Sequence, residues 1–149
     1  MTSIINKKKS WDFIKEICNY CETYNIDLPE ESFNYYYRSP EVDSEYKRWK
    51  QEKHNLLNTL FSDNQGVSVR PNDFPYHFES GLIHYIVWLN PNYFDPDKIS
   101  PRMTKIVKDY VTNVFNISSN NYEWVYFRNS PNNRTISYIP HYHVVVKLQ

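Results

Sequence analysis

Several features that would assign a class at once are scarce or absent in this 149-residue chain. It has only two cysteines and two glycines, and its 17 basic side chains are balanced by 17 acidic ones. Because there is no net charge, no global field draws the chain to nucleic acid or a membrane, and long duplexes are not expected partners. The longest apolar run, residues 82–89, is too short to span a bilayer.

The N-terminus and the cysteines exclude further classes. Residues 1–10 contain lysines but no apolar stretch typical of a secretory signal, so we expect a soluble cytoplasmic protein with no membrane partner. Cys18 and Cys21 form a lone C-x-x-C without a second ligand pair, so we expect neither a metal site nor a cofactor. Both lie within a helical pattern, which favours buried thiols in a core.

Aromatic residues, in contrast, are abundant at 17%, with 14 tyrosines, and they can supply core area that the modest aliphatic content does not. The length indicates one domain with a substantial core. We expect residues 1–9 to be flexible, residues 10–61 to form a helical part, and residues 67–148 to form a sheet with one helix.

Helix starts are marked by Ser10 and by two serine–proline pairs. Apolar residues recur at helical spacing after Ser10, and the pair Ser39-Pro40 opens a helix expected to continue to about Phe61. The pair Ser100-Pro101 begins the most regular helical pattern of the chain. A segment at 30–37 is consistent with either a helix or an extended conformation.

Four segments have the pattern of strands: residues 67–70, 82–89, 123–127 and 137–148. The second is apolar on both faces, which predicts a central position in a sheet. N-terminal helices come first, and one helix separates this central strand from the C-terminal strand pair. That order predicts a single α+β domain with a largely antiparallel sheet.

The last strand divides its side chains between two faces, since alternate residues point to opposite sides. One face carries His141, His143, Val145 and Lys147, and the other carries Tyr142, Val144, Val146 and Leu148. The second face is apolar and is predicted to belong to the core. The first lies beside a polar loop that contains Arg128, Asn129 and Arg134. Imidazoles and guanidinium groups suit a phosphate, so this face is a candidate anion site.

His84 and Trp88 share one face of the strand 82–89. A hydrogen-bonded core histidine and a core tryptophan are the ordinary interpretation. The functional alternative is a ligand-facing imidazole beside a platform on which a nucleic-acid base stacks. If the two strands are neighbours, the three imidazoles of His84, His141 and His143 could also meet at a metal ion, although no pattern of supporting residues indicates one.

Five blocks of the chain carry a family pattern. They are Arg38-Ser39-Pro40-Glu41 with Tyr46 and Trp49-Lys50, Asn72-Asp73-Phe74-Pro75-Tyr76, the strand from Gly81 to Trp88, Trp124-Val125-Tyr126-Phe127-Arg128-Asn129, and His141-Tyr142-His143-Val144-Val145-Val146. They resemble a family of uncharacterised proteins, common in fungi, whose named member is the N-acetylglucosamine-induced protein. Phe74 stands where that pattern has tryptophan, Arg134-Thr135 where it has Gln-Ser, and the middle region is shorter. The family has no established activity, so the resemblance implies no mechanism.

The C-terminal strand also resembles the histidine-triad (HIT) fold. Ser137 to His143 stands where those proteins have Q-x-V-P-H-x-H, with Asn129 at the start of the preceding loop. The resemblance implies that His143 is the nucleophile that attacks an α-phosphate. Val145 replaces the third histidine and can neither donate nor accept a proton. The loop also lacks the glycines whose backbone would cradle phosphate.

Three functions remain open. The preferred one is a HIT-like domain that binds a nucleotide, an mRNA cap, a sugar phosphate or a similar phosphate-bearing ligand without robust catalysis. Its expected ligand-binding residues are His84, Trp88, Arg128, Asn129, Arg134, His141, His143 and Lys147. The second is an active nucleotide phosphohydrolase or nucleotidyl transferase that uses His143. The third is a protein-interaction module whose aromatic helices around residues 35–49 bind a protein partner.

Overall fold

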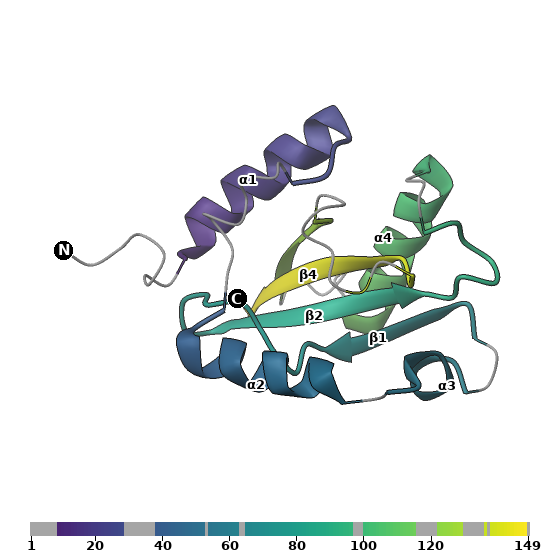
Figure 1. The fold of residues 1–149 in the computed structure, drawn as a ribbon. Coiled ribbons are helices and arrows are strands. Elements are labelled where there is room, and N and C mark those ends of the chain that lie inside the picture. The colour runs from purple at the N-terminus through teal and green to yellow at the C-terminus, as the bar shows by residue number, and fades with distance from the viewer. Residues whose placement is uncertain are drawn as a thin grey trace.

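The computed structural model is built on a four-stranded, fully antiparallel sheet (Figure 1). It describes residues 9–28, 38–52, 54–62, 65–96, 100–115, 122–129, 136 and 138–148. The strands are β1 (Val67–Pro71), β2 (Leu82–Leu89), β3 (Tyr122–Phe127) and β4 (His141–Leu148), and they lie in the order β1-β2-β4-β3. β2 is therefore central, as its two apolar faces predict, and the α+β, single-domain expectation is confirmed.

The helices are α1 (Trp11–Tyr24), α2 (Pro40–Gln51), α3 (Leu56–Leu60) and α4 (Pro101–Phe115). The three longer ones begin where the sequence predicts. The side-chain oxygens of Ser10, Ser39 and Ser100 each accept a hydrogen bond from the backbone N–H three residues later, at 3.1–3.4 Å. These bonds satisfy N–H groups that have no partner within a helix. Within the described ranges, no helix is long and apolar enough to cross a membrane.

The expectation of one helix from Pro40 to about Phe61 is wrong, because α2 ends at Gln51 and α3 begins at Leu56. Asn55 caps α3, since its side-chain oxygen accepts a 3.2 Å hydrogen bond from the N–H of Asn58. Asparagine competes with the backbone for such bonds and so favours caps over helix interiors. The last strand also starts later than expected, at His141. The segment 30–37 lies outside the described residues.

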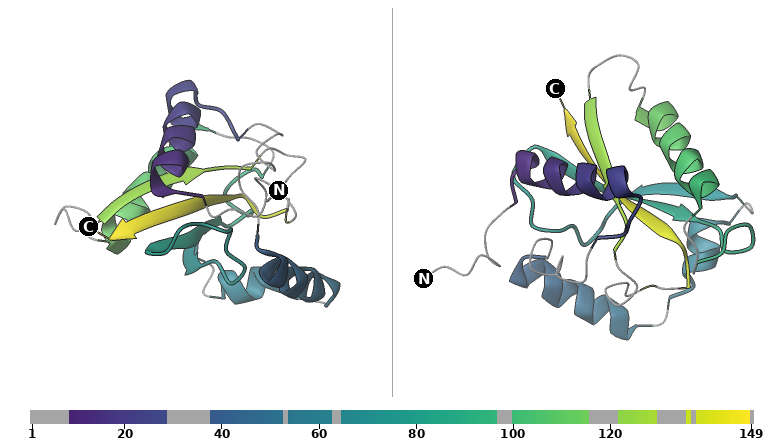
Figure 2. Two further views of the ribbon diagram at one scale, coloured as in Figure 1. Left: turned by 90° about the vertical axis from the view of Figure 1, so that its left-hand side faces the viewer. Right: turned by 90° about the horizontal axis from the view of Figure 1, so that it is seen from above.

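One face of the sheet packs against α4 and is largely apolar, as the alternation along β4 predicts. Its main cluster of buried residues comprises Val67, Val87, Leu89, Met103, Val107, Val111, Tyr142, Val144 and Val146. Figure 2 shows α4 on the other side of the sheet from α2 and α3. This layer is the largest hydrophobic cluster among the described residues.

The other face carries two smaller clusters, one formed with α1 and one with α3, and Figure 1 shows these two helices at separate places along the sheet. The α1 cluster contains Trp11, Ile14, Cys18, Cys21, Leu28, Val125, Phe127 and Val145. The α3 cluster contains Leu60, Phe61, Ile86, Trp88 and Ile139. Cys18 and Cys21 are buried, as predicted. Between the two clusters runs a strip of polar and aromatic side chains, and this strip holds the three strand histidines.

Candidate functional site

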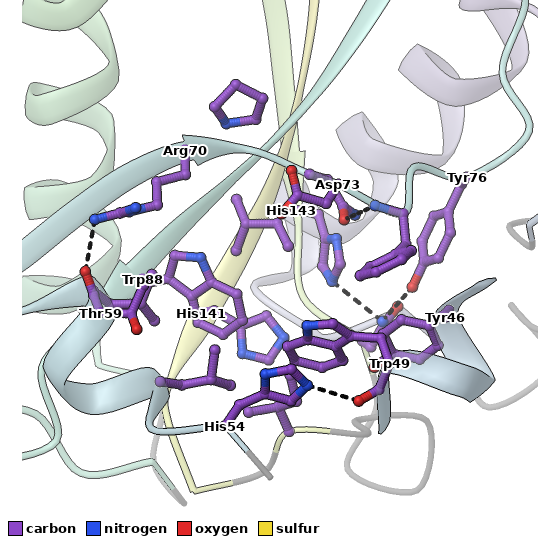
Figure 3. A pocket seen from close by; sticks show the side chains of 18 of the residues that line it. Tyr46, Trp49, His54, Thr59, Arg70, Asp73, Tyr76, Trp88, His141 and His143 are labelled. Atoms are coloured by element: carbon purple, nitrogen blue, oxygen red, sulfur yellow. Dashed lines mark hydrogen bonds between the residues drawn. The ribbon is translucent and has the colours of Figure 1, made fainter. Parts of the chain in front are cut away.

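A pocket of about 530 Å³ opens over the polar strip (Figure 3). The sheet contributes Ile86, Trp88, His141 and His143 to its lining. The α2–α3 region contributes Tyr46, Trp49, His54, Asn55, Leu56, Thr59 and Leu60. Also in the lining are Arg38 before α2, Arg70 and Pro71 at the end of β1, Asn72, Asp73, Phe74 and Tyr76 after that strand, and Asn129 after β3. Volumes of this order accommodate ligands of nucleotide size.

His84 lies behind this pocket, and its protonation is fixed by its neighbours. Its Nδ1 faces two donors, the backbone N–H of Tyr76 at 3.2 Å and the side-chain amide nitrogen of Asn72 at 3.4 Å. The orientation of the Asn72 amide is set, because its oxygen accepts a 2.9 Å hydrogen bond from the N–H of Phe74. Nδ1 of His84 must therefore be an acceptor, and the ring hydrogen of the neutral imidazole lies on Nε2.

The tautomer of His84 determines that of His143. Nε2–H of His84 donates to Nδ1 of His143 at 2.8 Å. The neutral ring of His143 then carries its own hydrogen on Nε2, which lies 3.3 Å from Nδ2 of the Asn129 amide. Because two N–H donors cannot bond to each other, this tautomer requires the Asn129 amide to turn so that its oxygen faces Nε2. That amide is also 2.8 Å from the hydroxyl oxygen of Tyr76. A continuous chain of hydrogen-bonding groups thus runs from the Tyr76 backbone to Asn129.

Both imidazoles of this chain are held neutral. His84 is 4% exposed and His143 is 3% exposed. Burial, with a smaller effect of Arg38, lowers the pKa of His84 to about 3. Burial, followed by the influence of His84, His141 and Arg38, brings the pKa of His143 well below 6.5. Neither ring therefore supplies positive charge to a phosphate near neutral pH.

The same tautomers bear on catalysis by His143. A nucleophilic imidazole attacks through a ring nitrogen lone pair that is directed at phosphorus. In His143 the lone pair is on Nδ1, which accepts the hydrogen bond from His84. The other ring nitrogen, Nε2, then carries the hydrogen of the neutral ring. With Nδ1 occupied by His84 and Nε2 protonated, neither nitrogen offers a lone pair to the pocket, and this geometry does not favour a nucleophile.

Nuclear magnetic resonance can check this assignment directly. In long-range ¹⁵N–¹H spectra, we expect His143 to show a protonated, pyrrole-type Nε2 and an unprotonated Nδ1, unchanged between pH 7 and pH 5.5. In the variant His84→Phe, which removes the donor to Nδ1, this fixed pattern should be lost. A protonated Nδ1 in the unaltered protein would contradict the chain of tautomers.

His141 differs from the other two histidines. Its Nδ1–H donates to the backbone carbonyl of Ile139 at 2.8 Å, so Nε2 is the basic nitrogen of the neutral ring. The ring is partly exposed within the pocket lining and packs against the indole of Trp88, with ring centres 4.7 Å apart. Of the three imidazoles, that of His141 has the most solvent access.

Two guanidinium groups supply the pocket's permanent positive charge. Arg38 donates from Nε to the Phe74 carbonyl at 2.7 Å, and its guanidinium carbon lies 3.9 Å from the centre of the Tyr46 ring. Arg70 donates to the Thr59 carbonyl at 2.8 Å. Within the described part of the chain, neither arginine forms an ion pair with a carboxylate. Asp73 adds one negative charge to the lining.

An aromatic wall stands over the sheet on the α2 side. The indole of Trp49 stacks on the His54 ring with centres 4.1 Å apart and planes 17° apart. Phe74 packs against both Trp49, at 5.6 Å, and Tyr46, at 5.2 Å. The pocket is therefore bounded by aromatic faces from α2 and by Trp88 from β2.

The structure brings together only part of the predicted set. Trp88, Asn129, His141 and His143 line the pocket, and His84 supports His143 from behind. Lys147 is absent from the described lining and pairs in register with Leu82 and Glu123, away from this pocket. Arg134 lies outside the described residues.

Arg128 is on the opposite face of the sheet. Its guanidinium group lies 5.3 Å from the Tyr142 ring centre and 4.0 Å from the sulfur of Met103 on α4. It is 4% exposed, and Nε is 3.8 Å from a carboxylate oxygen of Asp27. The interactions of Arg128 are those of a buried structural ion pair.

Sequence reasoning missed most of the helix and loop side of the pocket. The missed residues include Arg38, Tyr46, Trp49, Arg70, Asn72, Phe74 and Tyr76. A signal was present, because all of these except Arg70 belong to the blocks that carry the family resemblance. Those blocks, far apart in the sequence, converge on this pocket.

The metal alternative gains no support from the geometry. Across the described ranges, no three His, Cys, Asp or Glu side chains are placed to hold a metal ion. Nε2 of His84 and Nδ1 of His143 are 2.8 Å apart, whereas two nitrogens bound to one zinc would each need about 2.0–2.1 Å from the metal and a wider separation.

These features define a single-domain α+β protein with a pocket lined by aromatic side chains, imidazoles and arginines over one face of its sheet. The chain belongs to the family described as protein of unknown function (DUF3605), whose model matches residues 11–147. It is similar to the crystal structure of HTC1, with 20% sequence identity, a TM-score of 0.58, and coverage of 95% of this chain and 86% of that one. At that identity the likeness shows the fold alone. No curated protein matches the chain.

Proposed function

We propose that this pocket binds a nucleotide-type or other phosphate-bearing ligand without robust catalysis. The single observation that carries the proposal is the placement of two arginines and two tryptophans, Arg38, Arg70, Trp49 and Trp88, around one cavity of about 530 Å³. Nucleotides, mRNA caps and sugar phosphates all present an anion, and the first two also present a flat ring. The histidine-triad resemblance of the C-terminal strand points to the same ligand class.

The arginines are suited to the anionic end of such a ligand. A guanidinium group donates to two phosphate oxygens at once and keeps its charge at all physiological pH values. Arg38 is already oriented by the Phe74 carbonyl and the Tyr46 ring, so little side-chain freedom remains to be lost on binding. Since no described carboxylate pairs with it, binding a phosphate requires no ion pair to break.

The tryptophans are suited to the flat end. Every nucleic-acid base has a π face, and stacking on an aromatic side chain contributes about 1–3 kcal/mol per base. The Trp49 indole already supports a planar ring, because the His54 imidazole lies nearly parallel to it at 4.1 Å. Trp88 bounds the cavity from the sheet but is 8% exposed and packs against His141, so the stacking surface is on the Trp49 side.

The alternatives have less support. A hydrolase or transferase that uses His143 would need a lone pair on Nε2, the nitrogen that carries the hydrogen in this tautomer. Val145, at the position of the third histidine, is buried in the α1 cluster. For a protein-interaction module, Tyr46 on α2 is 6% exposed and packs against Phe74. Its ring is therefore part of the pocket wall, and little of it is left for a partner's surface.

Isothermal titration calorimetry with nucleoside monophosphates, a cap analogue, ribose 5-phosphate and inorganic phosphate tests the proposal. We expect the nucleotides to bind and free phosphate to bind more weakly. Arg38→Ala should lower nucleotide affinity by about 10- to 100-fold, the loss typical of a hydrogen bond to a charged group. The control is Arg48→Ala, which removes an exposed arginine of α2 outside the pocket lining. Equal binding by the two variants, or no binding of any of these ligands to the unaltered protein, would refute the proposal.

A further inference from the structure

A second, more open hollow adjoins the pocket. It has a volume of about 450 Å³ and is lined by His54, Asn55, Leu56, Leu57 and Tyr138. Three of these residues, His54, Asn55 and Leu56, also line the first pocket. The two hollows therefore share a border at the junction of α2 and α3.

The second hollow keeps apolar side chains in contact with water. Tyr138 is 51% exposed and Leu57 is 40% exposed. An exposed phenol ring next to an aromatic-lined pocket is a surface on which a further planar group can stack.

The two arginines of the first pocket lie next to different helices. Arg38 lies just before α2 and His54 just after it, and the 12 residues of that helix span about 18 Å at a rise of 1.5 Å each. Arg70 contacts the last turn of α3 through the Thr59 carbonyl, so its guanidinium group lies at the other end of that helix from the shared border. The lining of the first pocket thus holds two permanent cations at separate places.

We propose that the two hollows together bind the end of a single-stranded nucleic acid. This inference rests on the proposed function and adds a second nucleotide to it. The terminal nucleotide occupies the first pocket, with its phosphate at one of the two arginines and its base on the Trp49 side. The second base stacks on Tyr138.

Single-stranded nucleic acid is favoured over a peptide by the chemistry of the two hollows. Cations and aromatic faces around one cavity match the phosphates and bases of a nucleic acid. The second hollow is lined by residues of α3, by His54 and Asn55 before it and by Tyr138, and none of these described lining residues belongs to a strand edge along which a peptide would form backbone hydrogen bonds. Because the protein has no net charge, the recognition is local and directed at an end of the strand.

The test compares mononucleotides with dinucleotides. Adenylate and the adenylyl dinucleotide are titrated in 5′-phosphorylated and 3′-phosphorylated forms, which also reveals the strand polarity. Stacking of the second base should make the dinucleotide of one polarity bind roughly 5- to 150-fold more tightly than its mononucleotide. Tyr138→Ala should abolish that gain and leave mononucleotide affinity unchanged, and Tyr138→Phe should retain the gain. Tyr20→Ala removes an equally exposed tyrosine, on α1, and should change neither affinity.

The outcomes separate this inference from the function on which it rests. Equal affinity for mononucleotide and dinucleotide overturns the inference and leaves the proposed function intact. If neither binds, both are overturned. A phosphotyrosine peptide that binds in a Tyr138-dependent way while the dinucleotide gains nothing assigns the hollow to a peptide and also overturns the inference.

Discussion

Acidification from pH 7 to pH 5 is expected to lower the free energy of unfolding by about 2 kcal/mol through His84 alone. In the unfolded chain this imidazole takes up a proton below its ordinary pKa of 6.5, whereas in the native protein its pKa is about 3. The unfolded state therefore binds more protons between these values. The stability from His84 is fully present above pH 6.5 and is lost as the pH falls toward 3. His143, whose pKa is also lowered, adds to the loss.

Urea denaturation at pH 7, 6 and 5 measures this slope. Most carboxyl groups remain ionised in this interval, so the imidazoles dominate the change. A double variant, His84→Gln with His143→Gln, should unfold at lower urea but show a much flatter pH dependence. His54→Gln, which removes an exposed imidazole, should keep the original slope. A stability independent of pH in the unaltered protein would show that the buried rings take up protons in the native state.

Replacement of Arg128 by alanine is expected to cost about 2–3 kcal/mol of stability and to leave ligand affinity unchanged. The guanidinium group is 4% exposed, and its loss deprives the Asp27 carboxylate, 19% exposed, of a nearby cation. Breaking a buried ion pair from one side typically costs about 3–5 kcal/mol. The lower value follows from the 3.8 Å spacing and the partial exposure of Asp27.

A double-mutant cycle with Asp27→Asn isolates the pairwise contribution, since Arg128→Ala should cost less when the carboxylate is already neutral. The matched control is Lys105→Ala, which breaks the exposed pair with Asp109 and should cost less than about 0.5 kcal/mol. If Arg128→Ala were as mild as this control, the buried pair would not stabilise the fold. If it weakened nucleotide binding instead, the sequence-based assignment of Arg128 to the ligand site would be right.

Local patterns predicted the framework because local chemistry determines it. The serine caps at Ser10, Ser39 and Ser100 act within one turn of helix, and the alternation along β4 requires only an extended backbone. Both were therefore visible in the sequence. The alternation of side chains along β3 also predicts which face of the sheet Arg128 lies on. Phe127 lies in the α1 cluster, so the residue after it, Arg128, points toward α4.

The pocket could not be assembled in the same way, because it depends on contacts between distant parts of the chain. His84 and His143 are 59 positions apart and meet only through the register of β2 and β4. Arg38 reaches the Phe74 carbonyl across 36 positions. Nothing near any of these residues in the sequence encodes the pairing.

The break between α2 and α3 was hidden for a different reason. Leu56 and Leu60 continue the apolar spacing of α2, so periodicity alone cannot distinguish one helix from two. The helix is interrupted at Asn55, whose side chain caps α3, and at His54, whose ring stacks on Trp49. Such competition between a cap and a continued helix is settled by tertiary contacts.

The α3 part of the pocket wall rests on the smallest of the three hydrophobic clusters, to which α2 contributes no residue. A layer with little buried apolar area opens at a lower free energy than the rest of a fold. A ligand that bridges this wall and the sheet must therefore hold the two together, and part of its contact energy is consumed in doing so. Affinity in this protein is then a property of the α2–α3 junction as well as of the lining, and a substitution that stiffens the junction would tighten binding without touching the ligand.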